Sequence, residues 1–235
     1  MGRPAPTRGV LGDAILNARA LEWCRALTVL PLTLLINVGL EAQEYSQLNS
    51  DQIKQKFGSY GVEVLAQTEA MRVANLYSEH DGERICRTLA VTRFSEPTPP
   101  ALEKADKLIR AGESIGLTLR SLGWSIEKKV AAQCAISPGS AFRALSGNAL
   151  IGGALSVRVY SLTTTSGDIR ADYAAIAEAY HPDHITLEAL EPCGDTTWKA
   201  LTQLEYEALS ALLEWVGADS HEESRRSRDR SNPRA

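Results

Sequence analysis

Residues 78–94 read SEHDGERICRTLAVTRF, and this stretch decides the fold that we predict. Asp81-Gly82 is typical of a tight hairpin turn. On either side of it, apolar and polar side chains alternate with the two-residue period of a strand. A third run of this kind, at residues 60–67, precedes them after a short turn. Three strands joined by short turns predict an antiparallel meander.

The strand after the turn has two faces that hold alternate residues. We expect them to be Ile85, Leu89 and Val91 on one face, interrupted by Arg87 and Arg93, and Cys86, Thr88 and Ala90 on the other.

The rest of the chain supplies helices and a second hairpin. Prolines in residues 95–100 end the sheet segment. Helical patterns follow at residues 101–112, where Leu102, Ala105, Leu108 and Ile109 share a face, and at residues 113–123. A strand, a helical turn and a hairpin over residues 154–180 come next. We predict an α+β fold, with an antiparallel sheet of about six strands, in two hairpin or meander groups, packed against helices.

Two helices have clear ends in the sequence. One begins at Asn49 or Ser50, either of which can cap it, and ends at Gly58. The other is a long amphipathic C-terminal helix over residues 196–216 with Asp195 as N-cap. Its apolar stripe consists of Trp198, Leu201, Leu204, Ala208, Leu212 and Trp215. We expect the stripe to pack on the domain's own sheet, with a partner helix as the alternative.

The N-terminal segment has the pattern of an export signal. Residues 26–40 contain no charged side chain and follow a leading segment that is net positive. The run is short for a membrane span and suits the apolar region of a signal peptide. We therefore interpret residues 1–42 as a signal cut near Gln43. An uncleaved anchor in the inner membrane and an ordinary buried helix are the alternatives.

Composition limits the organisation and the partners of the mature chain. A length of 235 residues suits one domain, which we place at residues 43–218, followed by a charged, disordered tail at 219–235. A net charge of −4 and an aromatic content of 6% argue against nucleic-acid binding. Contact with a membrane is expected only through residues 26–40, if they stay uncleaved.

Removal of the signal leaves three cysteines, Cys86, Cys134 and Cys193. In an oxidising compartment one disulfide can form among them, and all three pairings stay open. Their spacing is not that of metal ligands, so the alternative is three small buried hydrophobic residues.

The strongest candidate for chemistry is the turn at residues 178–188, EAYHPDHITLE. His181 and His184 flank Pro182-Asp183 and could face one ion, with Asp183 as a third ligand. Zinc accepts such nitrogen and oxygen donors. An ordinary surface turn is the competing interpretation, because Pro-Asp is a common turn pair.

The function that we expect is that of an exported, non-catalytic binding or assembly domain, periplasmic or at the cell surface. It needs no cofactor and acts on a protein or small-molecule partner. The alternative is an exported zinc-dependent hydrolase that uses His181 and His184. No pattern in the sequence indicates the oligomeric state.

Overall fold

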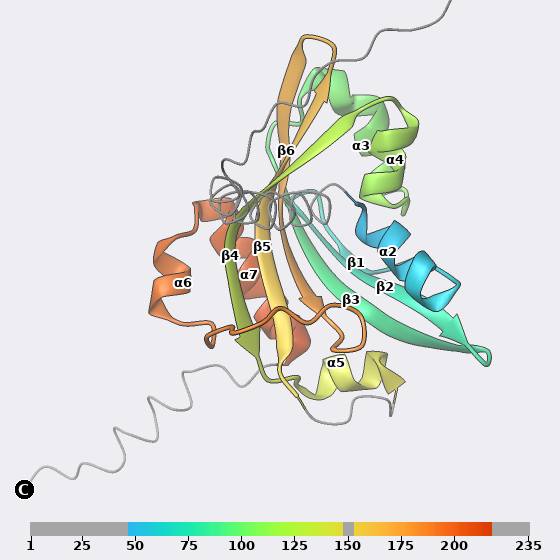
Figure 1. The fold of residues 1–235 in the computed structure, drawn as a ribbon. Coiled ribbons are helices and arrows are strands. Elements are labelled where there is room, and N and C mark those ends of the chain that lie inside the picture. The colour runs from blue at the N-terminus through green and yellow to red at the C-terminus, as the bar shows by residue number, and fades with distance from the viewer. Residues whose placement is uncertain (1–46, 148–152, 218–235) are drawn as a thin grey trace, which may run out of the picture. The chain divides into compact units, whose positions relative to one another are not determined.

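The structure, a computed structural model, describes residues 47–147 and 153–217. These residues form one six-stranded antiparallel sheet with helices on both faces (Figure 1). The predicted signal and tail, and residues 148–152, lie outside the described part. The strands are β1 (Gly61–Gln67), β2 (Met71–His80), β3 (Glu83–Phe94), β4 (Ser125–Ile136), β5 (Leu155–Ser166) and β6 (Ile169–Tyr180). The helices are α2 (Asn49–Phe57), η1 (Pro100–Leu102), α3 (Glu103–Arg110), α4 (Ile115–Ser121), α5 (Ser140–Leu145), α6 (Asp195–Lys199) and α7 (Gln203–Val216).

The sheet confirms the predicted α+β class and both strand groups. Its order is β1-β2-β3-β6-β5-β4, so the meander β1-β2-β3 meets the hairpin β5-β6 along β3 and β6. Asp81 and Gly82 form the predicted turn, and both have positive φ, 52° and 82°. None of the helices in the described ranges is both long enough and apolar enough to cross a bilayer.

The predicted faces of β3 are wrong at its first half because the strand contains a bulge. Leu76 pairs with Thr88 and the next residue, Tyr77, pairs with Cys86, so Arg87 is the extra residue. A bulge of this kind exchanges the faces on either side of it. Cys86 therefore joins the buried cluster that contains Leu89, while Ile85 is only half-buried.

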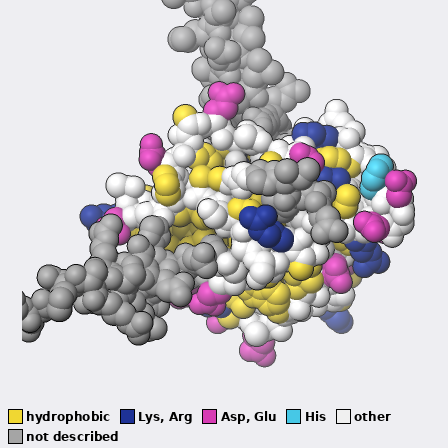
Figure 2. Space-filling view, turned by 90° about the horizontal axis from the view of Figure 1, so that it is seen from below, with side chains coloured by type: hydrophobic (Ala, Val, Ile, Leu, Met, Phe, Trp, Pro, Cys, Tyr) yellow, Lys and Arg dark blue, Asp and Glu magenta, His cyan; other side chains and the backbone are white. Residues whose placement is uncertain are grey.

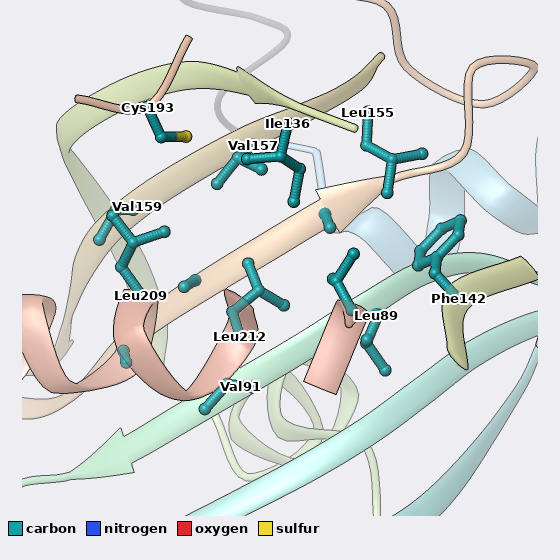
Figure 3. Close-up of a cluster of buried hydrophobic side chains, with 14 of the residues drawn as sticks. Leu89, Val91, Ile136, Phe142, Leu155, Val157, Val159, Cys193, Leu209 and Leu212 are labelled. Carbon is teal, nitrogen blue, oxygen red and sulfur yellow. The ribbon is translucent and has the colours of Figure 1, made fainter. Parts of the chain in front are cut away.

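Helix α7 covers one face of the sheet. Leu209 and Leu212 point from α7 toward the strands, where Val91 of β3 and the valines of β5 lie (Figure 3). These side chains are fully buried, and each stabilises the fold by about 1.5–3 kcal/mol. The predicted packing of the C-terminal helix on the domain's own sheet is confirmed.

The details of that helix differ from the prediction. Residues 200–202 interrupt it, so α6 and α7 are separate helices, and Asp195 is the first residue of α6 rather than its cap. Helix α7 begins with a capping box between Thr202 and Glu205, which satisfies its first N–H groups. The buried stripe is therefore rotated from the predicted one: Glu205, Ala208, Leu209, Leu212 and Val216 are buried, while Trp198, Leu201, Leu204 and Trp215 are half-buried.

Helices α2, α3 and α4 lie on the opposite face of the sheet (Figure 1). Leu102, Ala105 and Ile109 are buried as predicted, but Leu108 is 39% exposed, because the buried face of α3 consists of Ala105, Asp106 and Ile109. Elsewhere on the surface, hydrophobic side chains gather in patches between polar and charged ones (Figure 2).

A disulfide joins Cys134 of β4 to Cys193, while Cys86 stays a free, buried thiol. The backbone beside it pairs with β4, since Cys193 N–H donates to the carbonyl of Ala135 (3.1 Å). Of the three pairings left open by the sequence, the structure contains this one. The alternative, that all three cysteines are only buried hydrophobic residues, is wrong for this pair.

Candidate functional site

A cavity of about 70 Å³ lies between the sheet and the N-terminal ends of α2 and α4. All six strands contribute to it, because the sheet curls enough for edge strands β1 and β4 to line the same space. The lining residues are Leu48, Asn49, Ser50, Tyr60, Val62, Arg72, Ala74, Leu76, Ala90, Thr92, Ser114, Ile115, Gly116, Ile126, Lys128, Tyr160, Leu162, Ile176 and Glu178.

The cavity has a buried floor and a half-exposed rim. The central strands supply the floor, where small Ala74 and Ala90 on neighbouring strands leave the space open. The rim comes from the edge strands and α4, and includes Tyr60, Ile115 and Lys128. The volume has room for roughly two water-sized groups. Only a slim group fits on the floor, and a longer molecule would reach the rim.

A polar network closes one side of the cavity. Asn49, at the start of α2, donates from Nδ2 to Thr88 Oγ1 and to Glu178 Oε1, both at 3.1 Å. Its Oδ1 lies 2.7 Å from His184 Nε2, so this ring nitrogen carries the proton. The predicted capping role of Asn49 or Ser50 is wrong: Leu48 is the N-cap, because Asn49 bonds across to the sheet instead. The predicted end of α2 at Gly58 is confirmed.

Glu178 is a buried carboxylate whose oxygens have partners. The Tyr180 hydroxyl donates to its Oε2 at 2.6 Å, and Asn49 donates to its Oε1. Arg158 lies directly opposite Glu178 on β5. Burial, and then the nearby Glu178 charge, raise the pKa of Tyr160 and Tyr180, so they stay protonated donors. This arrangement fixes the position of the Glu178 side chain.

Arg72 is a buried cation that joins the cavity to α3. Its Nη1 donates to the carbonyls of Ile109 (3.0 Å) and Glu113 (2.7 Å), which belong to the C-terminal end of that helix and the turn after it. A cation at the negative end of a helix is favourable. Burial lowers the pKa of Arg72, with an opposing effect from Tyr60.

The predicted metal ligands lie beside this network and are engaged in other contacts. His181 Nδ1 accepts the Asp183 N–H at 3.1 Å, so the lone pair of this ring is already used. His184 donates to Asn49, and burial lowers its pKa to about 4. Both histidines are buried, whereas the predicted surface turn would expose them. Asp183 is exposed and lies 3.8 Å from the same His181 nitrogen and 3.9 Å from Arg87.

Across residues 47–147 and 153–217, no three side chains of His, Cys, Asp or Glu are gathered as a metal site. Zinc binding by His181, Asp183 and His184 stays a prediction, which metal analysis of the purified protein would check. In the arrangement described here these residues instead tie the segment after β6 to α2.

The sequence did not predict this cavity, which is the candidate site. Its residues come from eight elements and share no local spacing. One signal was present: Arg72, Lys128 and Glu178 are charged residues inside otherwise apolar strands. Lys128, for example, interrupts an apolar face of the strand that contains Trp124, Ile126 and Val130. Buried charges of this kind are rare without a partner, so they mark places where strands face something polar.

No protein-family model matches the chain, and a search of curated proteins finds no match.

Proposed function

We propose that the domain acts outside the cytoplasm as a non-catalytic binding domain that holds a small apolar or amphiphilic molecule in the cavity under α2 and α4. The observation that carries this proposal is the cavity itself, an apolar floor with a few fixed polar groups. Sites for small molecules have this composition. The engagement of both Glu178 oxygens supports binding over catalysis.

The disulfide supports the proposed location. Disulfides form and persist in oxidising compartments, and they are rare in the cytosol. The Cys134–Cys193 bond therefore agrees with the export that residues 1–42 predict. Mass spectrometry of the protein from fractionated cells would test this, with a mature chain that begins near Gln43 as the expected result. An intact chain in the cytoplasm would contradict it.

Binding can be tested with a slim neutral ligand. We expect 1-hexanol to bind the purified mature chain, measured by calorimetry, and to raise its melting temperature, because a ligand that binds only the folded state stabilises it. Ala90→Leu fills the cavity floor and should weaken binding at least about tenfold, since the added side chain occupies the ligand's space.

The matched control is Ala144→Leu, which adds the same side chain at an exposed position of α5, outside the cavity. It should bind hexanol as the unmodified chain does. Equal binding by Ala90→Leu and Ala144→Leu would show that the cavity is not the site. No binding of hexanol or of any related alkyl compound would overturn the proposed function.

A further inference from the structure

Two hydroxyl groups on the cavity wall have no hydrogen-bond partner among the described residues. Ser50 is 6% exposed and Thr92 is 3% exposed, and both line the cavity. Within the described residues neither hydroxyl makes a hydrogen bond. Neither oxygen is fully buried as an atom, so both hydroxyls can be reached from the cavity. These hydroxyl groups therefore indicate a ligand atom in the cavity that forms hydrogen bonds with them.

Further donors face the same space. Arg72 pairs directly with Thr92 across β2 and β3, and its buried Nε has no hydrogen-bond partner. Leu48, Asn49 and Ser50, at the start of the nine-residue helix α2, also line the cavity. No side chain caps this helix, and the Asp51 and Gln52 N–H groups donate to the Leu48 carbonyl. Within the described residues, the N–H groups of Asn49 and Ser50, at the positive end of the helix, are left for another acceptor.

The charges around the cavity favour the same kind of ligand. The partners of Nη1 and Nη2 of Arg72 are carbonyl oxygens, which accept hydrogen bonds but carry no full negative charge. Lys128 stands at the rim with its Nζ 5.1 Å from the centre of the Tyr160 ring. The single carboxylate on the wall, Glu178, faces Arg158 and has its oxygens bonded. The charge left unneutralised toward the cavity is positive.

We propose that the cavity takes an anionic amphiphile, whose carboxylate or phosphate oxygens accept from Ser50, Thr92 and the start of α2, beside Arg72. This inference rests on the proposed binding function. The small volume encloses the head group and the first carbons of the tail. The tail then leaves over the rim, where Ile115 and Ile126 provide apolar contact.

The structural roles of the two cations do not account for these groups. Arg72 caps the end of α3, and an inward-facing lysine on edge strand β4 hinders pairing with another sheet. Neither role involves the hydroxyls of Ser50 and Thr92 or the uncapped start of α2. An anionic head group gives all of them one partner.

The test compares ligands with the same tail and different heads. Calorimetry on the mature chain should give at least about tenfold tighter binding of hexanoate than of hexanol, because hydrogen bonds to a charged acceptor are stronger. Hexylamine should bind least. Hexyl phosphate distinguishes the two sources of the head group: tighter binding than hexanoate indicates a phosphate head, and weaker binding indicates a carboxylate head.

Variants of the cavity-lining residues test whether these residues cause the preference for hexanoate over hexanol. Thr92→Val keeps the shape and removes the hydroxyl, so hexanoate should bind about fivefold more weakly while hexanol changes less than about twofold. Lys128→Gln should reduce the preference for hexanoate about threefold, since it removes one positive charge at the rim. The controls are Thr165→Val, on β5 outside the cavity, and Lys129→Gln, an exposed lysine next to Lys128. Neither should change the preference.

Equal affinities for hexanoate and hexanol, or a preference for hexylamine, would overturn the anionic ligand and leave the binding function intact. An unchanged preference in Thr92→Val, in a variant that keeps its melting temperature, would also overturn it. Failure of all four ligands would instead count against the proposed function.

Discussion

Alternate residues of β3, β5 and β6 face α7 on one side of the sheet and α2 and α4 on the other. Toward α7 they are valine, leucine and alanine, and these are fully buried. Toward α2 and α4 the same strands present Thr92, Arg158 and Glu178, and a cavity remains. The two faces of the sheet therefore differ in packing and in polarity. The α7 face supplies closely packed apolar side chains that stabilise the fold. The cavity face is less closely packed and carries polar side chains.

The largest effect is expected on the α7 face. Leu212→Ala should lower the free energy of unfolding by about 2–5 kcal/mol, through lost burial and the space left behind. Urea unfolding measures it, and the loss should not depend on protein concentration. A melting temperature that rises with concentration would instead indicate that the helix meets a second copy. The control is Lys199→Ala at an exposed position, which should change stability by less than about 0.5 kcal/mol. Glu207 and Gln203 are unsuitable as controls, because Glu207 bonds Arg93 at 2.6 Å and accepts from Gln203 at 2.8 Å.

The next effect belongs to the cavity face and depends on pH. Burial lowers the pKa of His184 to about 4 from an ordinary value near 6.5, so the unfolded chain binds the proton more tightly than the folded one. Stability is then fully present above about pH 6.5 and is lost as the pH falls toward 4, by up to about 3 kcal/mol. Urea unfolding between pH 7.5 and 4 checks this.

His184→Gln provides the comparison for that prediction, because glutamine can still donate to Asn49 but does not titrate. The variant should lose less stability than the unmodified chain over this pH range. Identical pH dependence of the two proteins would mean that His184 is not held neutral by the fold.

A matched pair of alanines compares the packing of the two faces. Ala177 faces α7 and is fully buried, while Ala90 lies on the cavity floor of the neighbouring strand. Ala177→Leu should destabilise by about 1–3 kcal/mol, because a filled core has no room for the larger side chain. Ala90→Leu should cost less than about 1 kcal/mol, since it enters existing space. Equal losses of stability in Ala177→Leu and Ala90→Leu, measured by thermal unfolding, would show that the two faces are packed equally tightly.

The smallest effect concerns the start of α7. Thr202→Ala removes the cap and should cost about 1 kcal/mol. Burial alone would raise the pKa of Glu205, but the hydrogen bonds from Ser161 and Thr202 lower it. Thr202→Ser keeps the cap, so unfolding measurements should find it close to the unmodified chain. A loss as large in Thr202→Ser would show that the methyl group matters instead of the hydrogen bond.

The sequence by itself determined the elements and the class of this fold. The turn at Asp81-Gly82, the alternation in β3, the prolines after it and the hairpin of β5 and β6 are local signals, because backbone conformation and side-chain period act over a few residues. They also predicted a C-terminal helix that packs on the sheet through Ala208 and Leu212. Buried Leu209 and Val216 were missed, because the break at residues 200–202 rotates the stripe.

Tertiary structure alone decided the cysteine pairing, the bulge at Arg87 and the cavity. Cys134 and Cys193 are 59 residues apart in the chain and meet because β4 pairs with the segment before α6. Asn49 does not cap α2, because its side chain donates a hydrogen bond to Glu178, which is 129 residues later in the chain. The cavity depends on side chains from all six strands, and their proximity arises only when the sheet curls. No local spacing encodes such contacts, since strand order and curvature are set by the packing of the whole domain.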